Sequence, residues 1–251
     1  MSSNHAVASH HAHWDTSIWP LVISFGILFM LPLAFAFHFV YHLDLYAVIC
    51  LGVGVPMIVA GVVGWTKEAI GGGEGLSRGA MGWFILAEAM IFASFFANYW
   101  FNRLTADFWP PEATPAIPTV LPAIMTVVLV SSSFTIHYGE EALEHGNRGG
   151  FMKWLLITMI LGVAFVSMSA YEWNHLFHQG FYPSTNVYGT SFFSITGFHG
   201  GHVVVGLLGF VAVLLPALAG RISDGMVKTV SLYWHFVDII WLFVVSQIYY
   251  W

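Results

Sequence analysis

A few ionisable side chains lie inside long apolar stretches of this chain, where a charge that faces lipid costs at least a few kcal/mol. Glu88 is the most isolated of them, in the first half of the run Ala80–Phe101. A carboxyl in such a place can exchange protons, or it can be a hydrogen-bonded group that holds two helices together. The sequence leaves both interpretations of Glu88 open.

His235 and Asp238 form a second polar position within an apolar run. A spacing of three residues puts both side chains on one helical face, one turn apart. The pair can handle protons or contact a partner subunit, or it can be a polar pair that fixes helix packing. We expect His235 and Glu88 at a similar depth in the membrane, so a contact between them is one arrangement that the sequence allows.

His199 and His202 are also three residues apart, and two His on one face can be metal ligands. The chain has no HExxH pattern and no evident third and fourth ligand, so we expect no metal here. Gly197 and Gly201 form a small-xxx-small pattern, which predicts a close approach of two helix backbones. We therefore expect both imidazoles to hydrogen-bond across a tight helix contact.

The remaining polar positions are expected at the membrane surface. Glu172 should close its span as an interfacial carboxylate, which is inexpensive there. The amino-terminal segment carries a His cluster, at His5, His10, His11 and His13. Such a cluster can catch a metal ion, although a solvated tail is the interpretation that the polar surroundings favour.

The composition predicts the elements that must position these groups. Hydrophobic residues make up 58% of the 251 residues and charged residues only 8%, against roughly 25% in soluble domains. Aromatic residues reach 17%, which suits membrane interfaces. No basic patch indicates a nucleic-acid partner. Cys50 is the single cysteine, so an intrachain disulfide is excluded.

A transmembrane helix needs about 20 mostly apolar residues. We predict an all-α integral membrane protein with seven transmembrane helices, arranged as two plus five. The predicted spans are Ile18–Phe39, Leu45–Trp65, Ala80–Phe101, Thr119–His137, Met152–Tyr171, Ser191–Leu218 and Val227–Tyr250. The predicted organisation is a polar His-rich segment (1–17), a two-helix unit (18–65), a Gly-rich cytoplasmic loop (66–79) and a five-helix bundle (80–251).

The basic residues predict the orientation. If the amino terminus is cytoplasmic, the inner connections and adjoining span ends hold Lys67, Arg78, Arg148, Lys153, Arg221 and Lys228. The outer connections then hold only Arg103. The positive-inside rule therefore predicts an inside amino terminus and an outside carboxyl terminus. The first apolar run is too long for the core of a cleavable signal peptide, so we expect it to remain as a span.

Several long segments resemble one family, subunit III of the haem–copper terminal oxidases. They are Phe84–Phe92, Trp109–Pro111, His145–Arg148, Phe192–Val203 and Tyr233–Phe243. The likeness extends from about Leu76 to the end of the chain and is weaker before that. Because the segments occur in the family's order, a chance match is not expected.

The resemblance implies an accessory subunit of cytochrome c oxidase, in a complex that reduces dioxygen to water and pumps protons. In this family haems and copper lie in subunits I and II, and subunit III has neither cofactors nor a catalytic centre. It packs beside subunit I, holds structural phospholipids in a V-shaped cleft between the first two helices and the other five, and supports proton uptake. The expected location is a bacterial-type inner (plasma) membrane.

The resemblance also assigns roles to particular residues. Glu88 matches the family's buried, carbodiimide-reactive glutamate. Arg78 and Arg221 match basic positions near lipid headgroups, and Trp65 matches an aromatic residue at the end of the second span. These three are therefore expected at lipid-binding positions.

Two alternatives remain open at this stage. The first is the same subunit in a quinol oxidase, since subunit III does not contact the electron donor. The second is an independent proton channel or transporter built around Glu88. Against the second, the sequence has no inverted repeat and no pair of broken helices.

Overall fold

The computed structural model describes residues 18–71 and 78–251 of the chain. The predicted His-rich tail (1–17) and residues 72–77 of the predicted Gly-rich loop (66–79) lie outside these residues. The rest of that loop is helical and not a loop, because α2 continues through 66–71 and α3 begins at Arg78. The chain divides into two compact units, Met1–Gly75 and Leu76–Trp251, and each is described here by itself.

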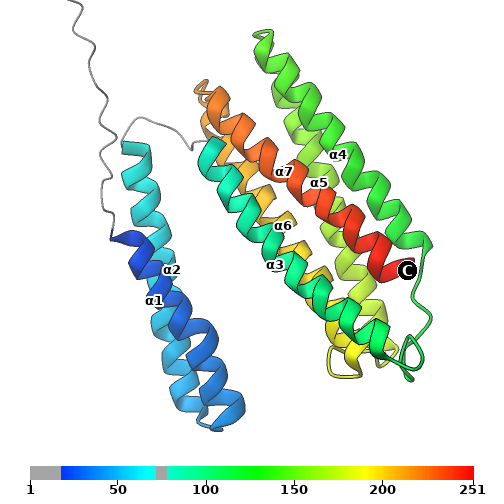
Figure 1. The fold of residues 1–251 in the computed structure, drawn as a ribbon. Helices are drawn as coiled ribbons and strands as arrows, with labels where there is room; N and C mark the ends of the chain where they lie inside the picture. The colour runs from blue at the N-terminus through cyan, green and yellow to red at the C-terminus, as the bar shows by residue number, and fades with distance from the viewer. Residues whose placement is uncertain (1–17, 72–77) are drawn as a thin grey trace, which may run out of the picture. The chain divides into compact units, whose positions relative to one another are not determined.

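All regular elements of the described residues are helices (Figure 1). The first unit contains α1 (Trp19–Leu28), the π-helical turns η1 (Phe29–Leu33) and η2 (Ala36–Val40), and α2 (Asp44–Gly71). The second contains α3 (Arg78–Thr105), α4 (Val120–Glu144), α5 (Arg148–His178), α6 (Val187–Leu218), α7 (Asp224–Val244) and the π-helical turn η3 (Val245–Tyr249).

Six helices of the described residues are long and apolar enough to cross a membrane, one fewer than predicted. They lie in α2 to α6 and in the run from Asp224 to Tyr249. The first predicted span is helical from Trp19 to Val40, but two π-helical turns interrupt it. Pro32 lies within η1. Proline has no N–H and its ring clashes with the carbonyl one turn earlier, which explains a locally widened helix there.

Glycines bring α1 and α2 into backbone contact in the first unit. A Cβ on Gly54 would lie 2.7 Å from the carbonyl oxygen of Gly26. A Cβ on Gly26 would lie 2.9 Å from the carbonyl oxygen of Gly54. Gly61 and Gly64 of α2 leave room for the side chains of Ile23 and Trp19, which an added Cβ would approach to 2.5 Å and 2.3 Å. The small-residue contact that membrane helices favour is therefore located here.

Several helices of the second unit extend beyond the predicted spans. α4 continues to Glu144, so Gly139 lies inside a helix and not in the predicted loop. α5 begins at Arg148 and runs on to His178. Asn147 caps it, because the side-chain oxygen accepts a hydrogen bond of 2.8 Å from the Gly150 N–H. These helices thus extend through polar residues beyond the apolar runs from which they were predicted.

α7 is the central helix of the second unit, and in its most apolar 18 residues 61% of the positions are buried, against at most 28% in the other spanning helices. Trp234 is fully buried, and its indole N–H donates a bond of 2.8 Å to Ser132 of α4. The ring lies against Gly162 of α5 and Gly206 of α6, where an added Cβ would come within 2.8 Å and 2.7 Å of it. Trp241, about two turns further along the same face of α7, donates to Thr126 of α4 at 2.9 Å. Two tryptophans of α7 thereby fix its contacts with three neighbouring helices.

The carboxyl-terminal turn η3 is bound by side chains from distant helices. Tyr99 of α3 donates to the carbonyl of Gln247 at 2.9 Å, and Tyr188 of α6 donates to that of Ile248 at 2.9 Å. These bonds satisfy carbonyls that a helix end would otherwise leave without partners. The last turn of the chain is thus an integral part of the bundle.

Candidate functional site

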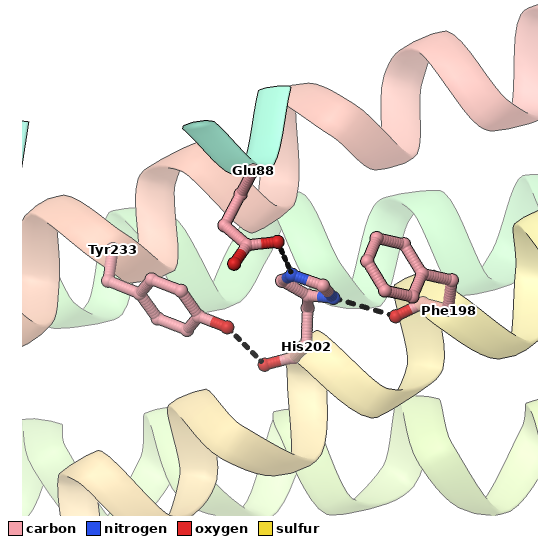
Figure 2. A network of polar contacts seen from close by, with 4 residues as sticks. All are labelled: Glu88, Phe198, His202 and Tyr233. Carbon is pink, nitrogen blue, oxygen red and sulfur yellow. Dashed lines mark hydrogen bonds and ion pairs between the residues drawn. The ribbon is translucent and has the colours of Figure 1, made fainter. Parts of the chain in front are cut away.

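Glu88 forms a carboxyl–imidazole pair with His202 in the second unit (Figure 2). α3 supplies Glu88 and α6 supplies His202, and their Oε2 and Nε2 atoms are 3.1 Å apart. The other ring nitrogen of His202, Nδ1, lies 2.7 Å from the carbonyl oxygen of Phe198. Tyr233 of α7 donates its hydroxyl to the carbonyl of His202 at 3.2 Å. Three helices therefore meet at this pair.

The geometry fixes how many protons the pair carries. A carbonyl oxygen only accepts hydrogen bonds, so Nδ1 of His202 must carry a proton. The contact between Nε2 and Glu88 then needs one further proton, on either the imidazole or the carboxyl. In both placements the pair is neutral overall. This explains how Glu88 is accommodated in an apolar bundle without an isolated buried charge.

A pocket of about 460 Å³ lies beside the pair. Its wall is mainly apolar and aromatic, with Glu88, His202 and Tyr233 as its polar members; the other lining residues are Phe84, Ile91, Gly197, Phe198, Gly201 and Val205. An apolar cavity with a few polar groups is suited to a ligand that is largely hydrocarbon.

The contact considered between Glu88 and His235 is not formed, because Glu88 is bonded to His202. His235 faces α4, where its Nδ1 lies 3.0 Å from the hydroxyl oxygen of Ser133. Ser133 in turn donates to Asp238 Oδ2. His235 and Asp238 thus lie on one face of α7, as their spacing indicates, and they are joined through a serine of another helix.

His199 and His202 have different environments. His202 makes the two hydrogen bonds described above, as expected. His199 is 1% exposed, lies against Phe165 and Trp241, and neither ring nitrogen has a hydrogen-bond partner in the described parts of the chain. The expectation that both rings hydrogen-bond across a helix contact is therefore wrong for His199.

The small-residue pattern of α6 does not bring two backbones together. Gly197 makes room for the ring of Trp173, which a Cβ would approach to 2.8 Å. A Cβ on Gly201 would meet nothing within 4 Å, and this residue lines the pocket beside Glu88. The prediction of a close backbone approach at these two glycines is thus wrong, because an aromatic side chain and a cavity occupy the space.

Glu172 is not an interfacial carboxylate. The helix continues for more than a turn beyond it to His178, and Glu172 is only 1% exposed. Its Oε2 accepts a hydrogen bond of 2.7 Å from the hydroxyl of Tyr249. No local sequence pattern indicates this bond, because Glu172 and Tyr249 are 77 positions apart.

The three positions assigned to lipid lie at helix ends. Arg221 is exposed in the connection between α6 and α7. Arg78 is the first residue of α3, and Trp65 lies in the last part of α2. The side chains of Arg78 and Trp65 lie outside what the structure describes.

Two residues of these networks were absent from the sequence interpretation. Ser133 joins His235 to Asp238, and Tyr233 supports His202. The run Ser131-Ser132-Ser133 within an apolar span was a usable signal, because hydroxyls in a membrane helix commonly bond to neighbouring helices. For Tyr233 no local pattern was usable, because its partner His202 is 31 positions away on another helix.

Over residues 18–71 and 78–251, six apolar helices of spanning length and polar groups paired within the bundle define an all-helical integral membrane protein. The family model described as Cytochrome c oxidase subunit III matches residues 9–251. The chain belongs to the cytochrome c oxidase subunit III family, whose members form a complex with other oxidase subunits.

Individual relatives carry the same name. Cytochrome c oxidase subunit 3 of Synechocystis sp. is 38% identical over 170 residues, covering 66% of this chain and 72% of the relative. The probable cytochrome c oxidase subunit 3 of Nocardia farcinica is 40% identical over 179 residues, covering 70% and 87%. The subunit 3 of Scyliorhinus canicula is 31% identical over 268 residues, covering 97% and 99%. The similarity thus extends over nearly the whole of this chain.

Proposed function

We propose that this chain is the non-catalytic accessory subunit III of a proton-pumping cytochrome c oxidase in aerobic respiration. In this role it stabilises subunit I, holds structural phospholipids and supports proton uptake, while haems and copper lie in subunits I and II. The observation that carries the proposal is the family match over residues 9–251. The names of the relatives favour cytochrome c over a quinol as the electron donor.

The proposed topology has seven spans, with the amino terminus in the cytoplasm and the carboxyl terminus outside a bacterial-type plasma membrane. The helical run from Trp19 to Val40 would be the additional span. Support comes from contacts at one end of the second unit, where Arg148 donates to the carbonyl of Gly220 and Lys228 pairs with Glu144. Basic residues gathered at one end of a bundle agree with a cytoplasmic surface.

The lipid role rests on the pocket beside Glu88 and on the basic helix ends. A largely apolar pocket of about 460 Å³ suits a hydrocarbon chain. Arg221, Arg78 and Trp65 would hold the headgroup region, since cations and aromatic rings favour the membrane interface. Glu88 itself is bonded to His202, so it contributes to helix packing as well as to the pocket wall.

Purification of the tagged chain in a mild detergent tests this function. We expect haem absorbance in the visible spectrum and two larger membrane subunits among the co-purifying peptides. Oxygen consumption with reduced cytochrome c and with a quinol then identifies the donor. A colourless chain that purifies alone would contradict the proposal, and proton flux in liposomes would then test the alternative of an independent proton channel.

A further inference from the structure

A pocket of about 270 Å³ lies between α4 and α7, away from the Glu88 site. It is lined by Glu140 of α4 and by Lys228, Ser231, Leu232 and His235 of α7. Half-buried His235 connects the pocket with the interior of the bundle through its two ring nitrogens. Its Nε2 lies 3.5 Å from the hydroxyl oxygen of Ser231, at the pocket wall, and its Nδ1 lies on the Ser133 side.

A chain of hydrogen bonds runs from His235 to a buried carboxyl. Nδ1 of His235 is 3.0 Å from Ser133 Oγ, and Ser133 donates to Asp238 Oδ2. Asp238 is 6% exposed, and its Oδ1 is buried with no hydrogen-bond partner in the described parts of the chain. Because the Ser133 proton points to Asp238, Nδ1 of His235 must donate to Ser133, which leaves Nε2 to accept a proton from the pocket.

We propose that His235 and Ser133 relay protons between water in this pocket and Asp238, which makes Asp238 a buried proton-exchange site. A proton from water binds Nε2 of His235, and the proton on Nδ1 passes to Ser133 Oγ. The hydroxyl proton of Ser133 passes to Asp238 Oδ2. One proton enters and one proton arrives, so the step needs no other reactant, and the reverse sequence returns the proton to the pocket.

The charged groups around the relay lie mainly at its pocket end. Glu140 and His137 of α4 are within electrostatic reach of His235. Lys228, on the pocket wall, is paired with Glu144.

The ionisable groups of the other packed helices are directed elsewhere. Glu88 of α3 and His202 of α6 are bonded to each other, and His202 lies against Tyr233 and Phe236. His199 of α6 contacts Trp241, and Glu172 of α5 is bonded to Tyr249. Pocket water is therefore the group that can exchange protons with His235, while Glu140 and His137 act on His235 electrostatically.

The exchange site does not depend on which complex contains the chain, so its test is separate from that of the proposed function. Infrared spectra of the purified assembly are recorded through a titration from alkaline to acid pH. The carboxyl C=O band that is lost in Asp238→Asn belongs to Asp238. We expect this band to appear on acidification and to shift when H₂O is replaced by D₂O.

The rate of the D₂O shift tests the relay. We expect Ser133→Ala to slow it about 100-fold, the low end of what a positioned proton donor contributes, and Ser133→Thr to restore it. His235→Phe interrupts the same path and serves if Ser133→Ala fails to assemble. The matched control is Ser131→Ala, since Ser131 is half-buried like Ser133 but bonds to the Val127 carbonyl of its own helix.

Two results would overturn the proposal. The first is the absence of any Asp238 band that responds to pH. The second is a D₂O shift that is as fast in Ser133→Ala or His235→Phe as in Ser131→Ala. In either case the three residues would serve helix packing alone.

Discussion

Tyr249, two residues before the end of the chain, donates a hydrogen bond of 2.7 Å to Glu172 on the buried face of α5. It is the only partner that the described residues give this carboxyl, because Glu172 Oε1 is buried without one. A side chain from the last turn thus completes the polar contacts of a helix in the middle of the sequence. The pairs Tyr99–Gln247 and Tyr188–Ile248 extend this dependence to α3 and α6.

Tyr249→Phe should lower stability through Glu172. The substitution keeps the ring and removes the donor, so a buried carboxyl loses its hydrogen bond at a cost of about 1–3 kcal/mol. The measurement is the thermal unfolding of the purified complex followed by tryptophan fluorescence. Tyr250→Phe is the control, since Tyr250 is exposed and donates to the Thr119 carbonyl. An equal shift in both variants would contradict this role of Glu172.

Gly206→Ala should disturb the centre of the second unit. An added Cβ would lie 2.7 Å from the ring of fully buried Trp234, and such overpacking typically costs about 1–3 kcal/mol. Gly200→Ala, in the same helix, has nothing within 4 Å of the new Cβ and should be neutral or stabilising. The unfolding temperatures of both variants and of the unsubstituted protein test this. An unfolding temperature of Gly200→Ala that is as low as that of Gly206→Ala would contradict it.

Gly54→Ala should separate α1 from α2. The new Cβ would meet the Gly26 carbonyl at 2.7 Å and the Met30 nitrogen at 2.8 Å, and backbone atoms cannot move aside as a side-chain end can. Hydrogen–deuterium exchange of peptides from α1 in the intact complex should therefore become faster. Gly52→Ala, which meets nothing within 4 Å, should leave it unchanged. Equal exchange rates in the two variants would exclude a glycine-dependent contact.

Glu88→Ala should leave assembly largely intact and should not abolish oxygen reduction. Glu88 is one half of a neutral pair with His202, and in the proposed role the haems and copper lie in subunits I and II. Subunit content of the purified complex and its oxygen consumption are the measurements. Complete loss of activity in a fully assembled complex would contradict an accessory role.

Combining Arg78→Ala with Arg221→Ala should reduce the phospholipid that co-purifies with the complex. Each Lys or Arg near the membrane surface contributes about 1 kcal/mol of attraction to anionic headgroups. Lipid extraction and mass spectrometry give the lipid content per complex. Arg103→Ala is a control from the opposite end, where Arg103 lies 4.3 Å from the Trp251 ring. An unchanged lipid content in the double variant would argue against headgroup binding at these two positions.

The helical class and most spans could be predicted because long apolar runs have few structural solutions in lipid. Helix ends could not, since α4 and α5 continue through polar residues such as Glu141 and His175. An apolar run indicates which part of a helix lies in the hydrocarbon, whereas the helix itself can extend into the polar interface. The π-helical turns near Pro32 depend on local backbone packing that a hydropathy pattern does not contain.

The polar positions were found in the sequence, but their partners were not. Spacing within α7 correctly put His235 and Asp238 on one face, because helical periodicity is local. Ser133, which joins them, is 102 residues from His235. The choice of His202 over His235 as the partner of Glu88 depends on how α3, α6 and α7 are rotated about their axes, which the spacing within one helix does not encode.

The position of the carboxyl-terminal turn has a consequence for biosynthesis. α3 to α6 leave the ribosome and enter the bilayer before the segment that binds Tyr99, Tyr188 and Glu172 has been translated. Until the codons for Gln247, Ile248 and Tyr249 are read, these groups remain without their native partners in the membrane. A chain that ends early through a nonsense mutation or ribosome stalling therefore displays unsatisfied polar groups on three otherwise complete helices, α3, α5 and α6. Membrane proteases that detect such groups can then distinguish finished from unfinished copies.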